Sequence, residues 1–323
     1  MQPAGEIFPA MANAKVWPPA PAQPCVKYLG AIASAADLKP ARSLWVRAVG
    51  PEPEQKLVAP IDVAVSPSDQ VFVADRDRRV VHCFDLGTRR HMLIGEGTLE
   101  LPSAVAWGDE RLFIADSRMG QVFTWSPERP QLTRFDLADL KSPAGLAYVP
   151  ERQALCVADL GTRTLVLLDR DGKPIAQFPP DDAPVELGSP MHVAYHPDVG
   201  LVVSDTINGR LVRFDPDGTY RDTIGSAGDG TGNLALPKGV AADSEGHVYV
   251  VDARFENVQL FDREGRVLMD FGEEGVQPGQ FSLPAGICVD GRNRIWVADT
   301  YNCRVQVFQF LGAPPASGGA SDE

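Results

Sequence analysis

The sequence has few cysteines and none of the spacings that build a zinc module. Its five cysteines, none of them in a Cys-x-x-Cys pair, are Cys25, Cys83, Cys156, Cys288 and Cys303. This spacing excludes a zinc ribbon or a RING-type module, and it demands no disulfide. We expect Cys83, Cys156 and Cys288 to be small buried side chains, because they fall on expected strands.

Signals of membrane insertion, export and common catalysis are also missing. No stretch approaches the ~18 apolar residues that span a bilayer, so we expect no transmembrane segment. The N-terminus has no charged region followed by an apolar segment, so we expect no signal peptide in this chain. There is no Gly-x-Ser-x-Gly elbow and no Walker-type loop, and no cysteine has a recognisable nucleophile context. These absences favour a protein that is not an enzyme.

Basic charge is scarce relative to acidic charge. The chain has 30 Lys and Arg against 43 Asp and Glu, which gives a formal net charge of −13 at pH 7. Nucleic-acid binding needs a basic face that neutralises phosphates. We therefore expect no nucleic-acid partner.

What the sequence does contain is a repeat. Six times an apolar run ends in an aspartate followed by a turn, as in the segment Val-Phe-Val-Ala-Asp at 71–75. The six aspartates, spaced 41 to 47 residues apart, are Asp75, Asp116, Asp159, Asp205, Asp252 and Asp299. That period is typical of propeller blades.

Alignment of the chain with itself supplies the rest of each blade. Every unit opens with a proline and an apolar strand, continues with the strand that ends in aspartate, and adds a third strand and, in all but the last unit, a fourth. Turns such as Asp-Pro-Asp-Gly at 215–218 suit tight hairpins. Four short strands per unit, without a convincing long helical period, predict an all-β, six-bladed propeller.

Ring closure and domain limits follow from the ends of the repeat. The last unit stops at its third strand, residues 304–308, so we expect an N-terminal strand at 44–50 to complete the sixth blade and leave no exposed edge. Residues 44–310 are then the propeller. We expect a Pro/Ala-rich lead, largely extended or disordered, over 1–43, and a disordered acidic tail over 311–323.

Three segments resemble NHL repeats. They are Asp-Thr-Tyr-Asn-Cys-Arg-Val-Gln-Val-Phe at 299–308, Asp-Thr-Ile-Asn-Gly-Arg-Leu-Val-Arg-Phe at 205–214, and the stretch 271–286. The resemblance covers roughly residues 45–310 and is strongest in blades four to six. More narrowly, the chain resembles stand-alone NHL propellers of bacterial cell envelopes, which are often lipoproteins. That resemblance implies a periplasmic or lipid-anchored location and no settled activity.

In a propeller, the turns between the second and third strands share one face with the loops that link the blades. The candidates for a partner-binding face in those turns are Arg76, Arg79, Met119, Arg254, Phe255 and Tyr301. Aromatic side chains there are suited to anchor a partner, or they fold over the blades as local packing. The acidic loops around this more basic zone suit a basic or mixed-charge protein or peptide. The alternative is a solvated surface that keeps the chain soluble.

The six repeated aspartates have a structural interpretation. Identical copies at one position of every repeat indicate an architectural device rather than a metal or catalytic site. We expect each carboxylate to accept hydrogen bonds from the following turn and, in two blades, to pair with Arg210 or Arg304.

The central channel offers a different pair. The second residue after each blade-opening proline should face the channel, and it is small in four repeats but Asp62 and His192 in blades one and four, which lie opposite in a ring of six. A water-bridged polar pair, a single bound calcium or zinc ion, and an acid–base pair are the alternatives. Related six-bladed amidating lyases place several metal-binding histidines there, and two ligands are too few for a firm zinc site.

These features predict a non-enzymatic scaffold that presents one loop-built face to a protein or peptide, with the bacterial cell envelope implied by the resemblance. The alternative is a metal-dependent hydrolase or lyase whose site at the channel mouth uses Asp62 and His192.

Overall fold

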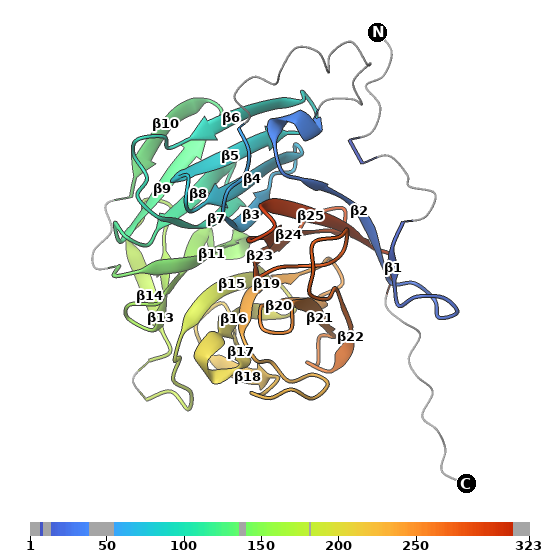
Figure 1. The fold of residues 1–323 in the computed structure, drawn as a ribbon. Helices are drawn as coiled ribbons and strands as arrows, with labels where there is room; N and C mark the ends of the chain where they lie inside the picture. The colour runs from blue at the N-terminus through green and yellow to red at the C-terminus, as the bar shows by residue number, and fades with distance from the viewer. Residues whose placement is uncertain (1–6, 9–13, 39–54, 136–139, 181, 313–323) are drawn as a thin grey trace, which may run out of the picture.

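The computed structural model describes residues 7–8, 14–38, 55–135, 140–180 and 182–312. Over these residues the chain forms six antiparallel sheets arranged as the blades of a ring (Figure 1). The innermost strands of neighbouring blades contact one another all the way round. The prediction of an all-β, six-bladed propeller is confirmed. No helix within the described ranges is long and apolar enough to cross a membrane.

The first five blades each use four consecutive strands. Blade one contains β3 (Pro60–Val65), β4 (Gln70–Asp75), β5 (Val80–Asp85) and β6 (Arg90–Ile94). Blade two contains β7 (Pro102–Gly108), β8 (Arg111–Asp116), β9 (Gln121–Ser126) and β10 (Arg129–Arg134). Blade three contains β11 (Pro143–Val149), β12 (Ala154–Asp159), β13 (Thr164–Leu168) and β14 (Pro174–Phe178). Blade four contains β15 (Pro190–His196), β16 (Gly200–Asp205), β17 (Arg210–Phe214) and β18 (Tyr220–Ile224). Blade five contains β19 (Pro237–Ala242), β20 (Val248–Asp252), β21 (Asn257–Phe261) and β22 (Val267–Phe271).

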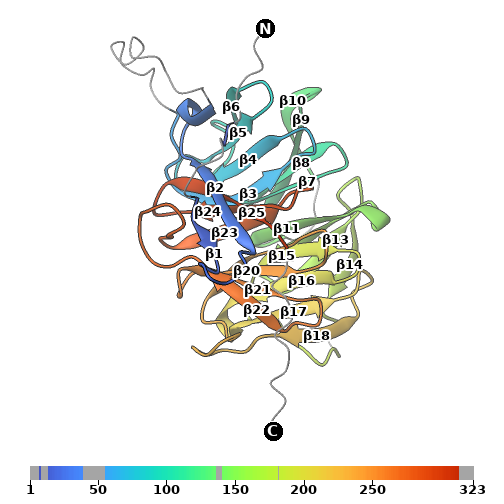
Figure 2. The same ribbon diagram turned by 90° about the vertical axis from the view of Figure 1, so that its right-hand side faces the viewer.

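The sixth blade joins the two ends of the chain. Its last-repeat strands are β23 (Pro284–Val289), β24 (Arg294–Asp299) and β25 (Arg304–Phe310), and its N-terminal strands are β2 (Val26–Ile32) and β1 (Val16–Trp17). β2 pairs antiparallel with β25, as Figure 2 shows. The prediction that an N-terminal strand completes this blade is confirmed. That strand is β2 and not residues 44–50, which lie outside the described residues, because β2 occupies the free edge of β25.

Position within the blade explains the composition of the strands. The second strands, such as β12 and β16, are buried along their whole length, because neighbouring blades cover both of their faces. They are therefore mainly apolar up to the aspartate at their end. The outermost strands, such as β14 and β18, are partly or fully exposed except at their last residue. Short 3₁₀ turns link some strands, namely η1 (Ala35–Leu38), η3 (Pro150–Arg152) and η4 (Thr206–Asn208).

The hydrophobic core of the described residues is divided into six clusters, and each lies between two neighbouring blades. The cluster between blades six and one includes Ile32 of β2 and Leu38 of η1. The N-terminal segment therefore supplies both hydrogen bonds and apolar contacts to the closure of the ring.

The closing role of β2 can be tested by its contribution to the free energy of unfolding. Ile32 is fully buried and lies opposite Val305, so Ile32→Ala should lower the free energy of unfolding by about 3 kcal/mol, through lost burial and the cavity it leaves. Lys27→Ala on the same strand, at a half-buried position, is the control and should change it by less than about 1 kcal/mol. Urea unfolding measures both. Equal effects of the two substitutions would contradict a closing role for β2.

Candidate functional site

The six repeated aspartates are fully buried at the ends of the second strands. Each accepts hydrogen bonds from backbone N–H groups of the loop that enters its own blade, a connection the sequence did not predict. Asp205 accepts from Gly188 and Ser189 at 2.9 and 2.8 Å. Asp116 adds the expected bonds from its following turn, from Arg118 and Met119. The carboxylates thus hold together the loops of one face, which we call the aspartate face.

Side chains complete some of these carboxylate sites. Arg210 and Arg304 donate to Asp205 and Asp299 at 3.1 and 2.8 Å, as the repeat predicted. Gln306, on the third strand of blade six, also donates to Asp299 at 3.0 Å. These contacts leave the carboxylates fully engaged within the fold.

In blade one, two histidines lie in a row beside the repeated aspartate, Asp75. His82 is fully buried, and its Nε2 lies 3.5 Å from Asp75 Oδ2, while its Nδ1 bonds His91 Nε2 at 3.0 Å. His91 in turn contacts Gln55. Burial raises the pKa of Asp75, but the adjacent His82 ring and hydrogen bonds from backbone N–H groups hold it below its ordinary value. Burial, together with the charges of His82 and Arg78, lowers the pKa of His91 to about 4.

The structure brings the two channel residues into contact. Asp62 Oδ1 lies 3.1 Å from His192 Nε2, and both side chains are mostly buried. Asp62 Oδ2 accepts the N–H of Val105 at 2.8 Å, and His192 Nδ1 accepts the N–H of Val240 at 3.3 Å. The bonds run across the channel from blade two through blades one and four to blade five.

Glycine makes this crossing feasible. A Cβ on Gly286 would collide with Asp62, and one on Gly145 would collide with the backbone of His192. The small residues of the innermost strands therefore leave the space in which the two polar side chains meet.

The hydrogen bonds of His192 define which of its ring nitrogens carries the proton. Because His192 Nδ1 accepts an N–H, the imidazole proton lies on Nε2 and points to Asp62. Both ring nitrogens are thus engaged, and a metal ligand or general base needs one of them free. No group of three or more His, Cys, Asp or Glu in the described part of the chain is arranged to hold a metal ion.

The predicted partner-face residues all lie on the aspartate face but differ in exposure. Tyr301 is 68% exposed, and Arg79 and Arg254 are also exposed. The other three are half-buried, and they are Arg76, Met119 and Phe255. Met119 packs against the core between blades one and two.

Sequence reasoning missed further apolar residues of this face. Seven large apolar side chains are exposed in the described residues, and four of them lie on the aspartate face, namely Val58, Ile207, Val276 and Tyr301. Ile207, 75% exposed, occupies the same position of its repeat as Tyr301, so the repeat alignment contained the signal that would have found it. The other three lie on outer strands or after β25, and they are Met92, Ile175 and Leu311.

A hollow of about 510 Å³ opens on the aspartate face between blades four and five. Ile207 and Phe255 line it, with Leu234 at its base. Arg254 and Asp229 supply one charge of each sign. The hollow therefore combines apolar walls with a mixed-charge rim, as small binding pockets often do.

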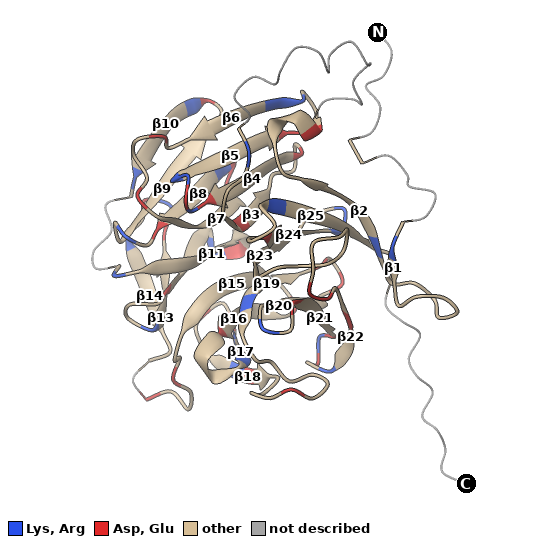
Figure 3. Ribbon diagram, viewed as in Figure 1, with Lys and Arg blue, Asp and Glu red and all other residues tan. Residues whose placement is uncertain are grey.

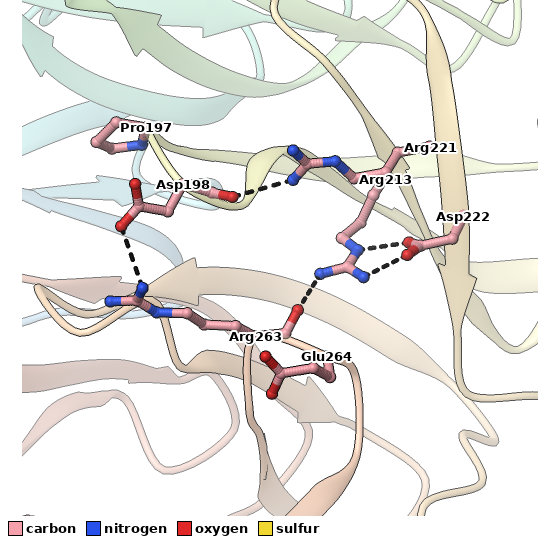
Figure 4. A pocket seen from close by; sticks show the side chains of 7 residues that line it. All are labelled: Pro197, Asp198, Arg213, Arg221, Asp222, Arg263 and Glu264. Carbon is pink, nitrogen blue, oxygen red and sulfur yellow. Dashed lines mark hydrogen bonds and ion pairs between the residues drawn. The ribbon is translucent and has the colours of Figure 1, made fainter.

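A larger hollow of about 740 Å³ on the opposite face is a weaker candidate (Figure 4). Its arginines are already engaged: Arg213 pairs with Asp222 and donates to the carbonyl of Arg263. Arg221 donates to the carbonyl of Asp198 at 3.0 Å. A third hollow of about 860 Å³ lies between blades two and three, and its lining is equally rich in internal ion pairs.

Charged residues of both signs are mixed along the loops in the view of Figure 3. Figure 3 shows Lys and Arg interspersed with Asp and Glu along the loops, without a broad area of one sign. All five cysteines are free. Cys83 and Cys156 are buried as expected, whereas Cys288 is only half-buried, because its position on the innermost strand faces the channel.

The two histidines of blade one predict a pH dependence of stability. Because the pKa of folded His91 is about 4, the unfolded chain takes up this proton first, near pH 6.5, and stability is lost as the pH falls from 6.5 towards 4. The difference in unfolding free energy between wild type and His91→Gln should shift by about 2 kcal/mol over this interval. Urea titrations at pH 7 and 4.5 measure it, and a pH-independent difference would contradict the prediction.

The channel pair predicts energetic coupling. His192→Ala removes the donor to a buried carboxylate and should lower the unfolding free energy by about 3 kcal/mol. The double variant Asp62→Ala/His192→Ala should lose at least about 1 kcal/mol less than the sum of the single variants. His196→Ala is a control at the far end of the same strand. Additive effects in urea unfolding would show that the two side chains do not depend on each other.

Comparison with known proteins identifies one repeat and shows which solved structures share the fold. The NHL repeat model matches residues 281–308, which span β23, β24 and most of β25. A comparison with curated protein sequences gave no match.

Solved structures share the fold at low sequence identity. A protein of unknown function from Bacteroides thetaiotaomicron VPI-5482 is similar with a TM-score of 0.67 and 17% identity, over 87% of this chain and 75% of that one. Virginiamycin B lyase from Staphylococcus aureus is similar with a TM-score of 0.61 and 13% identity, over 80% and 97%. An auxiliary nutrient binding protein from Bacteroides thetaiotaomicron VPI-5482 follows, with a TM-score of 0.62 and 14% identity, over 79% and 70%. The chain is therefore a six-bladed β-propeller that contains an NHL repeat.

Proposed function

We propose that the protein is a non-enzymatic scaffold whose aspartate face binds a protein or peptide through apolar side chains. The observation that carries the proposal is the gathering of Val58, Ile207, Val276 and Tyr301 on that face. Exposed apolar and aromatic groups that share one face are typical anchors of a protein interface. The resemblance to bacterial NHL propellers alone supports a location in the cell envelope.

The character of the partner follows from the rim. Arg254 and Asp229 line the hollow beside Ile207 and Phe255, and the chain as a whole is acidic, with a formal net charge of −13. A basic or mixed-charge partner with an exposed apolar residue fits this surface best, because opposite charges favour its approach and the apolar contact stabilises the complex.

The alternative is a metal-dependent hydrolase or lyase at the channel mouth. The contact between Asp62 and His192 is the observation in its favour. Both nitrogens of His192 are engaged, however, and this weighs against it. Near-stoichiometric zinc or calcium in purified protein, detected by plasma mass spectrometry and lost in His192→Ala, would favour the enzyme and count against the scaffold.

Selection of displayed random peptides on the immobilised protein tests the proposal. Wild type should select peptides that share an apolar residue, and Ile207→Asp/Tyr301→Asp should bind them about 30-fold more weakly, because it places charge where the apolar contact forms. Ile175→Asp is the matched control, since Ile175 is an equally apolar residue, 52% exposed, on the outer strand β14. Peptides that bind the double variant as tightly as wild type would contradict the proposal.

A further inference from the structure

The mouth of the channel lies at the centre of the aspartate face, where the innermost strands begin. The second residue of each innermost strand is half-exposed in all six blades, next to a buried proline. These six residues stand at the start of the innermost strands, and they are Ile61, Ser103, Ala144, Met191, Lys238 and Ala285. Lys238 is the single charged residue among them.

Lys238 carries a charge that no described residue pairs with directly. Within the described ranges its ammonium group makes no hydrogen bond or ion pair. Arg76, a cation whose charge acts on Lys238, already pairs with Asp77 at 2.8 Å. Burial lowers the pKa of Lys238, and Arg76 adds to this while Glu256 opposes it. A half-buried ammonium without a partner is unfavourable, and a carboxylate brought by a ligand would relieve that cost.

Glu256 forms no ion pair with Lys238 in the described structure. Its Oε2 accepts the N–H of Leu283 at 2.6 Å, and burial raises the pKa of its carboxyl group. The nearby carboxylate is thus engaged with the loop that enters blade six, and it leaves Lys238 available.

Lys238 is tied to the apolar part of the face. Thr206, which precedes the exposed Ile207, donates its hydroxyl to the carbonyl of Pro237, which precedes Lys238, at 2.6 Å. Phe255 and Arg254 belong to the same blade as Lys238. A peptide whose apolar residue rests against Ile207 and Phe255 would therefore have its neighbouring residues close to the Lys238 ammonium group.

We propose that Lys238 receives a carboxylate of the bound peptide, so that the aspartate face recognises an apolar residue followed closely by an acidic group. This inference rests on the proposed peptide-binding function. The carboxylate comes either from an Asp or Glu side chain or from the C-terminus of the peptide, and both present the same group to the ammonium.

The test uses one peptide selected on the wild-type protein. It is synthesised with its acidic residue, with that residue as the amide (Glu→Gln or Asp→Asn), and with a free or an amidated C-terminus. Fluorescence anisotropy measures binding to full-length wild type, Lys238→Gln, Lys238→Arg and Glu256→Gln. Unchanged urea unfolding midpoints verify that the variants are folded.

The expected result is a coupling specific to the carboxylate. Lys238→Gln should weaken the acidic peptide about tenfold, and it should leave the fully amidated peptide nearly unchanged. Lys238→Arg should retain most of the affinity, and Glu256→Gln should strengthen binding a few-fold, because it removes the competing charge while its amide oxygen still accepts from Leu283. The substitution that abolishes the effect of Lys238→Gln, in the side chain or at the C-terminus, identifies the source of the carboxylate.

Two other outcomes would overturn the inference. If Lys238→Gln binds the acidic and amidated peptides with the same ratio as wild type does, the carboxylate does not contact Lys238, and the peptide-binding function remains intact. If wild type selects no peptide, both the proposed function and this inference fail.

Discussion

The rest of the structure depends on one interaction, the hydrogen bonding of backbone N–H groups to the buried carboxylate at the end of each second strand. This carboxylate is fully buried in all six blades, and an unpaired charge there would be strongly destabilising. Each carboxylate therefore requires the loop that enters its blade to present N–H groups to it, as Gly188 and Ser189 do for Asp205. The loops of the aspartate face are held in place, while side chains such as Ile207 and Tyr301 in the adjoining turns remain exposed. A rigid frame with variable outward residues is the arrangement that binding surfaces commonly use.

The hydrogen bonding of buried polar groups also decides which part of the channel is available for binding. Asp62 and His192 satisfy each other and two backbone N–H groups, so this layer links four blades and offers few free atoms to a ligand. At the start of the innermost strand of blade five, Lys238 forms no hydrogen bond or ion pair within the described residues. Unsatisfied charge and exposed apolar surface thus both occur on the aspartate face. Because unrelated activities share this fold, these side chains carry the functional argument rather than the propeller itself.

Much of the architecture could be predicted, because each blade repeats a local pattern. The apolar run before Asp299 and the turn after it have the same form in all six units, and strands, turns and blade number follow from them. The closing strand was harder to predict. Residues 26–32 and the expected segment 44–50 are both short and apolar, and only pairing with β25 and the packing of Ile32 between blades six and one distinguish them.

The sequence by itself determined the blades, the architectural position of the six aspartates and the two polar residues of the channel, because these depend on spacing along one strand or turn. Tertiary structure alone decided that Asp62 meets His192 at 3.1 Å, that Ile207 is exposed beside Phe255 and that Lys238 forms no ion pair in the described residues. The first two relations join residues of different blades. Their distances are defined only when the ring has closed, since closure sets the width of the channel and the position of every loop around it.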